Sequence, residues 1–223
     1  MRESLTLVAL LLGVPHFCSG QLCGQSYNAR IAQIHQAAQQ LEGQKPRIVL
    51  TGSSSIRKWP QTDTVFAHFD VVNAGFGGSC FSDLWRLRDT LIYALRPNVL
   101  IVYEGDNDLS DGVPSEDILD VADQLLEEVS RRLPDTDIVV IAPKASRSRQ
   151  HLASAYLSLN KELRVVAMNH GAHWVDFWGV QHRADGTLRD DLFVADRLHL
   201  NDLGYTLWVD ELRRQLPWLD PNR

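Results

Sequence analysis

Five short apolar runs, separated by stretches with helical periodicity, constrain the fold of this 223-residue chain more than any other feature of its sequence. The runs cover residues 47–51, 69–73, 99–103, 137–142 and 174–177. Runs of this length, bounded by turn-forming residues, predict buried strands. Because each run is followed by a helix or by a connection that contains one, the order predicts a five-stranded parallel sheet with helices on both faces.

The stretches between the runs repeat their apolar residues with the spacing of one helix face. They predict helices around residues 31–41, 84–95, 118–129, 152–168 and 203–212. Gly43 ends the first of these helices and Pro97 closes the second. Ser115 and Asn201 are suitable N-caps for the third and the last. No internal repeat or linker interrupts the pattern, so we expect residues 21–223 to form a single α/β domain.

The composition is that of an ordinary globular protein, with 44% hydrophobic and 22% charged residues. The formal net charge is −6 and no basic run occurs, which argues against a nucleic-acid partner. No charge block or low-complexity tract indicates disorder. The oligomeric state is not indicated by the sequence.

Residues 1–20 predict a cleavable signal peptide. Arg2 precedes a mostly apolar core at residues 5–14, and small residues follow at Ser19 and Gly20. That core is too short to span a bilayer, and no later run is long enough for an integral membrane segment. We therefore expect a secreted or periplasmic protein, with a buried N-terminal helix as the weaker interpretation.

Export would place the mature chain in an oxidising compartment, where disulfides persist. Cys23 and Cys80 are the cysteines left after cleavage, and they can form one disulfide. Two separate buried thiols are the alternative, because the sequence does not show whether the two residues are close. A lipid anchor on Cys18 or Cys23 is weaker, since neither follows a leucine and two small residues in the usual register.

Polar and glycine-rich segments follow the first three predicted strands, at the sheet edge where parallel α/β folds bind ligands. They cover residues 52–55, 73–80 and 105–108, and Asp196 and His199 precede the last predicted helix. Hydroxyl, imidazole and carboxylate groups are the parts of a nucleophilic site. Glycine N–H groups and an asparagine amide can stabilise an oxyanion. The pattern therefore predicts a site for acyl transfer.

These segments resemble, in order, the four sequence blocks of the SGNH hydrolases, also called GDSL-type esterases. Residues 52–54 (Gly-Ser-Ser) resemble the Gly-Asp-Ser block, and residues 73–78 resemble the glycine-containing second block. Residues 105–107 (Gly-Asp-Asn) resemble Gly-x-Asn, and residues 196–199 (Asp-Arg-Leu-His) resemble Asp-x-x-His. One block is weak evidence, whereas four in order are specific. Within the family, the chain is most similar to exported bacterial members with a Gly-Ser-Ser-Ser first block.

The resemblance implies a flavodoxin-like three-layer fold and a catalytic triad. Ser54 would be the nucleophile, His199 its base and Asp196 the carboxylate that orients the base. The implied oxyanion donors are the N–H groups of Ser54 and Gly78 and the side-chain amide of Asn107. This chemistry needs no metal and no cofactor.

The chain departs from the family at Ser53, which replaces the usual aspartate before the nucleophile. Because three serines are consecutive, Ser53 and Ser55 stay open as alternative nucleophiles. Ser79 and Cys80 form a further candidate pair near the second strand end.

Two residues near the blocks are expected to bind substrate: Trp59, shortly after the first block, and Asp106, within the third. The acidic residues from Asp106 also suggest a calcium loop, but glycine is absent from its sixth position and glutamate from its twelfth. His170 and His173 lack a third ligand at metal-binding spacing, so no metal site is predicted.

We therefore expect an exported serine esterase for short acyl esters, above all acetyl esters, with a small-molecule ester or an acetylated glycan as substrate. The loops that carry the motifs are polar and no long apolar lid is evident. A lipase or lysophospholipase-type esterase is one alternative, and a glycan-binding module without turnover is another. The fold alone does not identify the alcohol that is released.

Overall fold

The computed structural model describes residues 24–220 and confirms the five parallel strands that the sequence predicts. The strands are β1 (Arg47–Gly52), β2 (Asp70–Gly75), β3 (Val99–Tyr103), β4 (Asp137–Ile141) and β5 (His173–Val175). Their order across the sheet is β2-β1-β3-β4-β5, and each neighbouring pair is parallel. All five carboxyl ends therefore lie at one edge of a single α/β domain.

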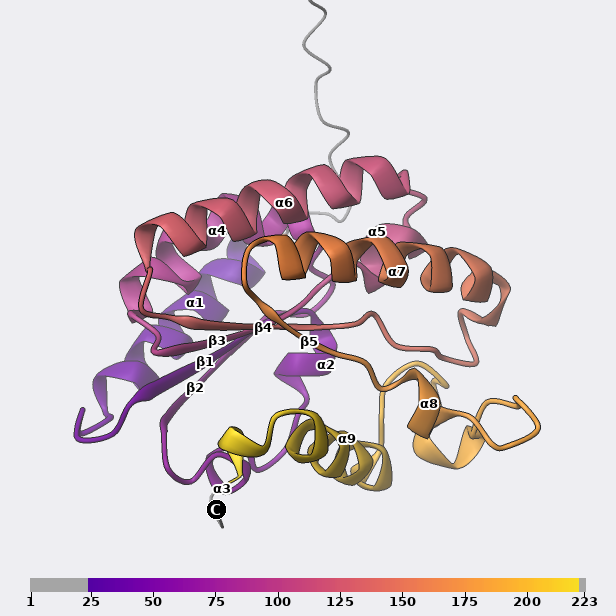
Figure 1. Cartoon of the computed structure of the whole chain (residues 1–223). Helices are drawn as coiled ribbons and strands as arrows, with labels where there is room; N and C mark the ends of the chain where they lie inside the picture. Colours follow the sequence, from indigo (N-terminus) through magenta and orange to yellow (C-terminus); the bar gives the residue numbers. More distant parts are fainter. Residues whose placement is uncertain (1–23, 221–223) are drawn as a thin grey trace, which may run out of the picture.

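Helices cover both faces of this sheet (Figure 1). The longer ones are α1 (Gly24–Gln39), α4 (Phe81–Leu91), α6 (Ser115–Arg132), α7 (Ala153–Asn169) and α9 (Asp202–Gln215). The shorter ones are α2 (Ser54–Arg57), α3 (Thr62–Val65), α5 (Asp106–Ser110) and α8 (Trp178–Gln181). Four 3-10 turns complete the described part of the chain, at Tyr93–Leu95, Gln150–Leu152, Asp190–Leu192 and Pro217–Leu219.

The central strand β3 divides the core in two, because alternate side chains of a strand point to opposite faces. Leu100 and Val102 pack with α1, α4, α6 and α7 on one face. Ile101 and Tyr103 pack with α9 on the other face, where fully buried Trp208 stacks on Phe177 at 4.4 Å between ring centroids. Figure 1 shows this three-layer arrangement, with α4, α6 and α7 above the sheet and α9 below it.

The helix boundaries differ from the prediction at one cap. Ser115 is the first residue of α6 rather than its N-cap, and Pro114 occupies the cap position with extended backbone. The expected cap of the last helix is confirmed, because the Asn201 side chain accepts a hydrogen bond from Gly204 N at 3.0 Å. Within residues 24–220 no helix is long and apolar enough to cross a membrane.

Candidate active site

The first strand ends in a turn that depends on Gly52. Its φ is 135°, and a Cβ at this position would lie 2.1 Å from the Tyr103 carbonyl oxygen of β3. Only glycine fits so close to the neighbouring strand in this conformation. The Ser53 N–H donates to the same carbonyl at 3.2 Å, and α2 begins at the next residue. The turn therefore places Ser54 at the carboxyl edge of the sheet.

The three consecutive serines differ in burial. Ser53 is 1% exposed and Ser55 is 2% exposed, whereas Ser54 is half-buried. The carbonyl of Ser55 accepts a hydrogen bond from the Tyr205 hydroxyl at 2.8 Å, which joins α2 to α9. Of the three hydroxyls, that of Ser54 faces the histidine of the fourth block.

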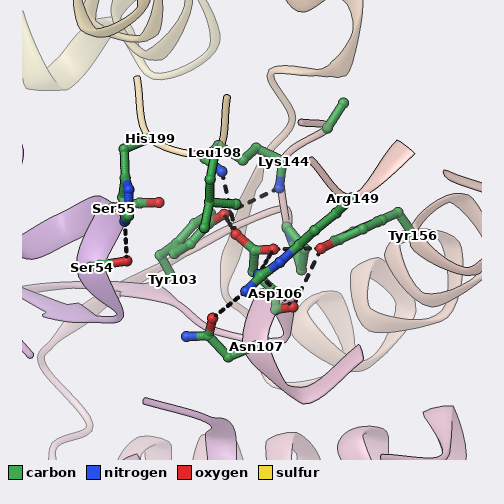
Figure 2. A network of polar contacts seen from close by, with 12 residues as sticks. Ser54, Ser55, Tyr103, Asp106, Asn107, Lys144, Arg149, Tyr156, Leu198 and His199 are labelled. Carbon is green, nitrogen blue, oxygen red and sulfur yellow. Dashed lines mark hydrogen bonds and ion pairs between the residues drawn. The ribbon is translucent and has the colours of Figure 1, made fainter. Parts of the chain in front are cut away.

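A chain of hydrogen bonds links Ser54 to Asp196. The Nε2 atom of His199 lies 2.8 Å from Ser54 Oγ, as Figure 2 shows, and its Nδ1 lies 2.6 Å from Asp196 Oδ2. Partial burial would raise the pKa of Asp196, but hydrogen bonds from the His199 ring and from the backbone N–H groups of His199 and Leu198 hold that pKa below its usual range. An ionised carboxylate on Nδ1 leaves Nε2 free to accept the hydroxyl proton.

The loop that carries His199 is fixed by backbone contacts on both sides of it. Phe193 and Leu200 form an isolated antiparallel bridge, and Val194 N donates to His199 O at 2.9 Å. The side chain of Asn201 donates to the Asp191 carbonyl at 2.8 Å while it caps α9. The imidazole is thereby held from the start of the last long helix.

The end of β2 approaches the same serine. A Cβ on Gly77 would lie 3.9 Å from Ser54 Cβ, so this glycine segment runs directly beside the nucleophile candidate. Asn73 Nδ2 donates to the Ile56 carbonyl at 2.8 Å and ties β2 to α2. Gly78 follows with a φ of 77°, a backbone conformation that favours glycine. Its N–H is thus carried on the loop closest to Ser54.

Asn107 is held at both ends of its side-chain amide. The Nδ2 atom donates to the Ser79 carbonyl at 2.8 Å, and the Oδ1 atom accepts from Arg149 Nη2 at 2.9 Å. An amide nitrogen carries two protons, so one N–H is left for another acceptor. Because Arg149 can only donate, it also fixes which end of the amide is nitrogen.

The structure corrects the prediction that Asp106 binds substrate. Its carboxylate is buried and accepts hydrogen bonds from Tyr103, Tyr156 and Arg149, as the network in Figure 2 shows. The buried Lys144 ammonium lies 3.4 Å from Oδ2. Burial alone would raise the pKa of Asp106, but these two cations hold it well below its usual range. The carboxylate therefore anchors Arg149.

The prediction that Trp59 binds substrate is also wrong. It is 3% exposed and packs in the core beneath α2, stacked on Tyr205 at 5.9 Å and edge-on to Trp208 at 5.6 Å. The pocket that Trp59 lines, together with Pro60 and Tyr205, does not include Ser54, so the ring does not contact the space in front of the nucleophile candidate.

Two further carboxylates, those of Glu104 and Asp108, lie buried next to the segment that follows β2. Glu104 accepts a hydrogen bond from Ser79 Oγ at 2.6 Å, and burial raises the pKa of Glu104 well above its usual range. Burial raises the pKa of Asp108 to about 7, although the backbone N–H groups of Phe81 and Gly105 donate to its carboxylate. No group of three or more histidine, cysteine or acidic side chains in the described residues is arranged to hold a metal ion.

The candidate nucleophiles Ser79 and Cys80 have other roles. Ser79 is fully buried on Glu104, and Cys80 is disulfide-bonded. Cys23, the expected disulfide partner, lies outside the described residues, as does the expected signal peptide. The pairing of Cys23 with Cys80 therefore stays a prediction.

Arg149 and Lys144 were missed by the sequence analysis. Both follow β4, in the segment Pro-Lys-Ala-Ser-Arg-Ser-Arg at residues 143–149. The rule that ligands bind at the carboxyl ends of parallel strands applies to this segment as well as to the first three. The three cations of this segment, Lys144, Arg147 and Arg149, were the available signal.

Known proteins resemble this chain both in sequence and in fold. A family model described as the GDSL-like Lipase/Acylhydrolase family matches residues 42–207, a range that includes Ser54 and His199. Among curated proteins, the human platelet-activating factor acetylhydrolase IB subunit alpha1 is 26% identical over 180 residues, which cover 77% of this chain and 76% of that protein.

Two solved structures share the fold. A GDSL-like lipase from Bacteroides thetaiotaomicron superposes with a TM-score of 0.69 and 14% identity, over 84% of this chain and 95% of the other. A variant of an acetyl xylan esterase from Geobacillus stearothermophilus superposes with a TM-score of 0.61 and 16% identity, over 76% and 94% respectively.

Proposed function

The chain belongs to the GDSL-like lipase/acylhydrolase family, a family of ester hydrolases, and from this premise we propose that it is an exported serine esterase for acetyl esters. The observation that carries the proposal is the hydrogen-bonded series Ser54–His199–Asp196 at the carboxyl edge of the sheet. A hydroxyl with a base at 2.8 Å, itself oriented by a carboxylate, is the arrangement that nucleophilic catalysis requires.

In the proposed reaction, Ser54 Oγ attacks the ester carbonyl carbon while His199 Nε2 accepts the hydroxyl proton. The tetrahedral intermediate collapses when the same imidazole protonates the leaving alcohol, and an acyl-enzyme remains. Water then attacks the acyl-enzyme with His199 again as the base, and the acid leaves. Asp196 stabilises the imidazolium that forms in both steps.

The oxyanion of each intermediate is proposed to lie among the N–H groups of Ser54 and Gly78 and the free N–H of Asn107. Donors that are fixed before the reaction stabilise the developing charge without reorganisation. The clamp on Asn107 supports this role, because its nitrogen end is already oriented by Ser79 and Arg149.

An acetyl group as the acid part is supported by two of the compared proteins, whose names are acetylhydrolase and acetyl xylan esterase. We propose an acetylated carbohydrate as the alcohol part, with a lipid acetyl ester as the second candidate. The second candidate is favoured by the curated relative, which is named for platelet-activating factor.

The test compares Ser54→Ala with Ser53→Ala and Ser55→Ala on a series of acyl esters from acetate to octanoate. Ser54→Ala should lower turnover about 10⁴-fold or more, because the covalent route is removed, while the two neighbours retain measurable activity. A fluorophosphonate probe should label Ser54 in the wild type. Labelling at Ser53 or Ser55 with an active Ser54→Ala protein would contradict the assignment, and a preference for octanoate would contradict acetyl esters as the substrates.

A further inference from the structure

A cavity of about 350 Å³ opens at the carboxyl edge of the sheet, between the segment after β4, the start of α7 and α8. Its walls include Arg149, Gln150, Leu157, Trp178 and His182. The volume falls in the lower part of the range for small-molecule sites. The mechanism proposed above uses none of these side chains to contact substrate.

Two hydrogen bonds connect the wall of the cavity to the residues of the proposed active site. Arg149, in its wall, donates to the side-chain Oδ1 of Asn107 at 2.9 Å. The neighbouring Ser148 N donates to Arg197 O at 3.1 Å, within the loop that carries His199. Because His199 must protonate the leaving alcohol, that alcohol binds on this side of the scissile bond.

Two aromatic rings form one wall of the cavity. The Trp178 indole and the His182 imidazole are stacked, with centroids 4.8 Å apart and planes at 23°. His182 Nδ1 lies 2.7 Å from the Trp178 carbonyl, and a carbonyl can only accept, so Nδ1 carries the proton. In the neutral ring, Nε2 is then an acceptor. The backbone N–H of Trp178 donates to Asp176 Oδ1 at 2.7 Å, which fixes the start of α8.

From this lining we propose that the cavity binds the sugar ring of an O-acetylated carbohydrate as the leaving alcohol. The inference rests on the esterase function proposed above. A pyranose ring has an apolar C–H face that packs on an aromatic surface, and hydroxyls that need both donors and acceptors. Trp178 supplies the surface, His182 Nε2 accepts, and the Arg149 and Gln150 side chains donate.

A lipid alcohol fits this lining less well. An alkyl chain would leave the Gln150 amide nitrogen, and the Arg149 N–H groups that do not already donate to Asp106 or Asn107, without partners in the cavity, which is costly. A quaternary ammonium is attracted to aromatic faces and to carboxylates, but the residues that line the cavity include the cation Arg149, which repels it, and no acidic side chain. The Asp106 carboxylate, which pairs with the cavity residue Arg149, is also held by Lys144.

The experiment measures kcat/KM for a mono-O-acetylated monosaccharide and for ethyl acetate, whose alcohol is too small to reach the cavity. In Trp178→Ala, the ratio of the two values should fall by about tenfold or more, the usual cost of losing one pocket contact. His182→Ala should lower the same ratio and serves as the second variant if Trp178→Ala does not fold.

Trp218→Ala is the matched control. Trp218 is also a partly exposed tryptophan packed on a histidine, with its ring centroid 5.4 Å from that of His173. His173 is the first residue of β5, so this pair lies at the amino end of the strands, away from the cavity. The ratio should be unchanged in this variant.

An unchanged ratio in both Trp178→Ala and His182→Ala would overturn the proposal. So would a fall confined to a 2-acetyl glycerophosphocholine substrate. Calorimetric titration of Ser54→Ala with the acetylated sugar tests the cavity without turnover, and binding there should be lost when Trp178 is also replaced. A wild type that binds the sugar but hydrolyses neither ester would contradict the esterase proposal and leave the sugar site standing.

Discussion

The most informative perturbation of this site is at Arg149, which contacts no reacting atom. Its Nη2 holds Asn107 Oδ1 at 2.9 Å, and its Nη1 is paired with the buried Asp106 carboxylate. Arg149→Lys keeps a positive charge near Asp106 but loses the planar fork that reaches both partners. We expect a folded protein whose Asn107 amide is held by the Ser79 carbonyl alone and can turn away from the oxyanion.

The magnitude follows from the contacts that are lost. A hydrogen bond to a charged group contributes about 1.5–3 kcal/mol, and loss of one oxyanion donor costs about 3 kcal/mol. Arg149→Lys should therefore lower kcat for ethyl acetate by about 10- to 100-fold, with little change in KM. The loss of kcat in Asn107→Ala sets the upper limit for the loss in Arg149→Lys, because Arg149 acts on this substrate through the Asn107 amide.

The assay is a double-mutant cycle of Arg149→Lys and Asn107→Ala, followed by initial rates with ethyl acetate. If Arg149 acts through the amide, the double variant should be within about twofold of Asn107→Ala alone. Losses that multiply would show that Arg149 supports the site by another route and would refute the reasoning. A loss below about fivefold in Asn107→Ala would remove Asn107 from the oxyanion site altogether.

Two further predictions concern stability and export. The raised pKa of Glu104 means that the folded state retains a proton that the unfolded state releases, so its contribution to stability is present at acidic pH and is lost as the pH rises. Between about pH 5 and 8, the free energy of unfolding measured with denaturant should decline less with pH for Glu104→Gln than for the wild type. The two slopes should differ by at most about 1.4 kcal/mol for each pH unit. An equal decline in both proteins would count against this. Mass spectrometry of the secreted protein should find a chain that begins close to Gln21, and an intact Met1 would contradict export by cleavage.

The sequence allowed the sheet and the edge that bears the site to be predicted because each strand is a local pattern. All five apolar runs are strands, and the fully buried β3 coincides with the run at residues 99–103. The cap at Asn201 was predictable for the same reason, since the residue and the backbone N–H that it satisfies are three positions apart.

The errors at Trp59 and Asp106 have a common physical cause. The partners that decide their orientation are far away in the chain: Tyr205 and Trp208 for the indole, and Lys144, Arg149 and Tyr156 for the carboxylate. A motif fixes which residue follows a strand, but long-range packing fixes whether its side chain points outward or into the core. Nor could the cavity beside α8 be predicted, because residues 178–196 carry no helical or strand periodicity.

The hydrogen bond between His199 and Ser54 joins residues 145 positions apart, one at the end of the first strand and the other before the last long helix. A polypeptide emerging from the ribosome exposes the serine early, yet has no base for it until almost the whole chain has been synthesised. Such a distant pairing also needs the intervening sheet to be in order, and long-range contacts form slowly during folding. Under the proposed mechanism, hydrolytic competence is therefore among the last properties that the maturing polypeptide acquires, and a chain terminated before His199 is inert.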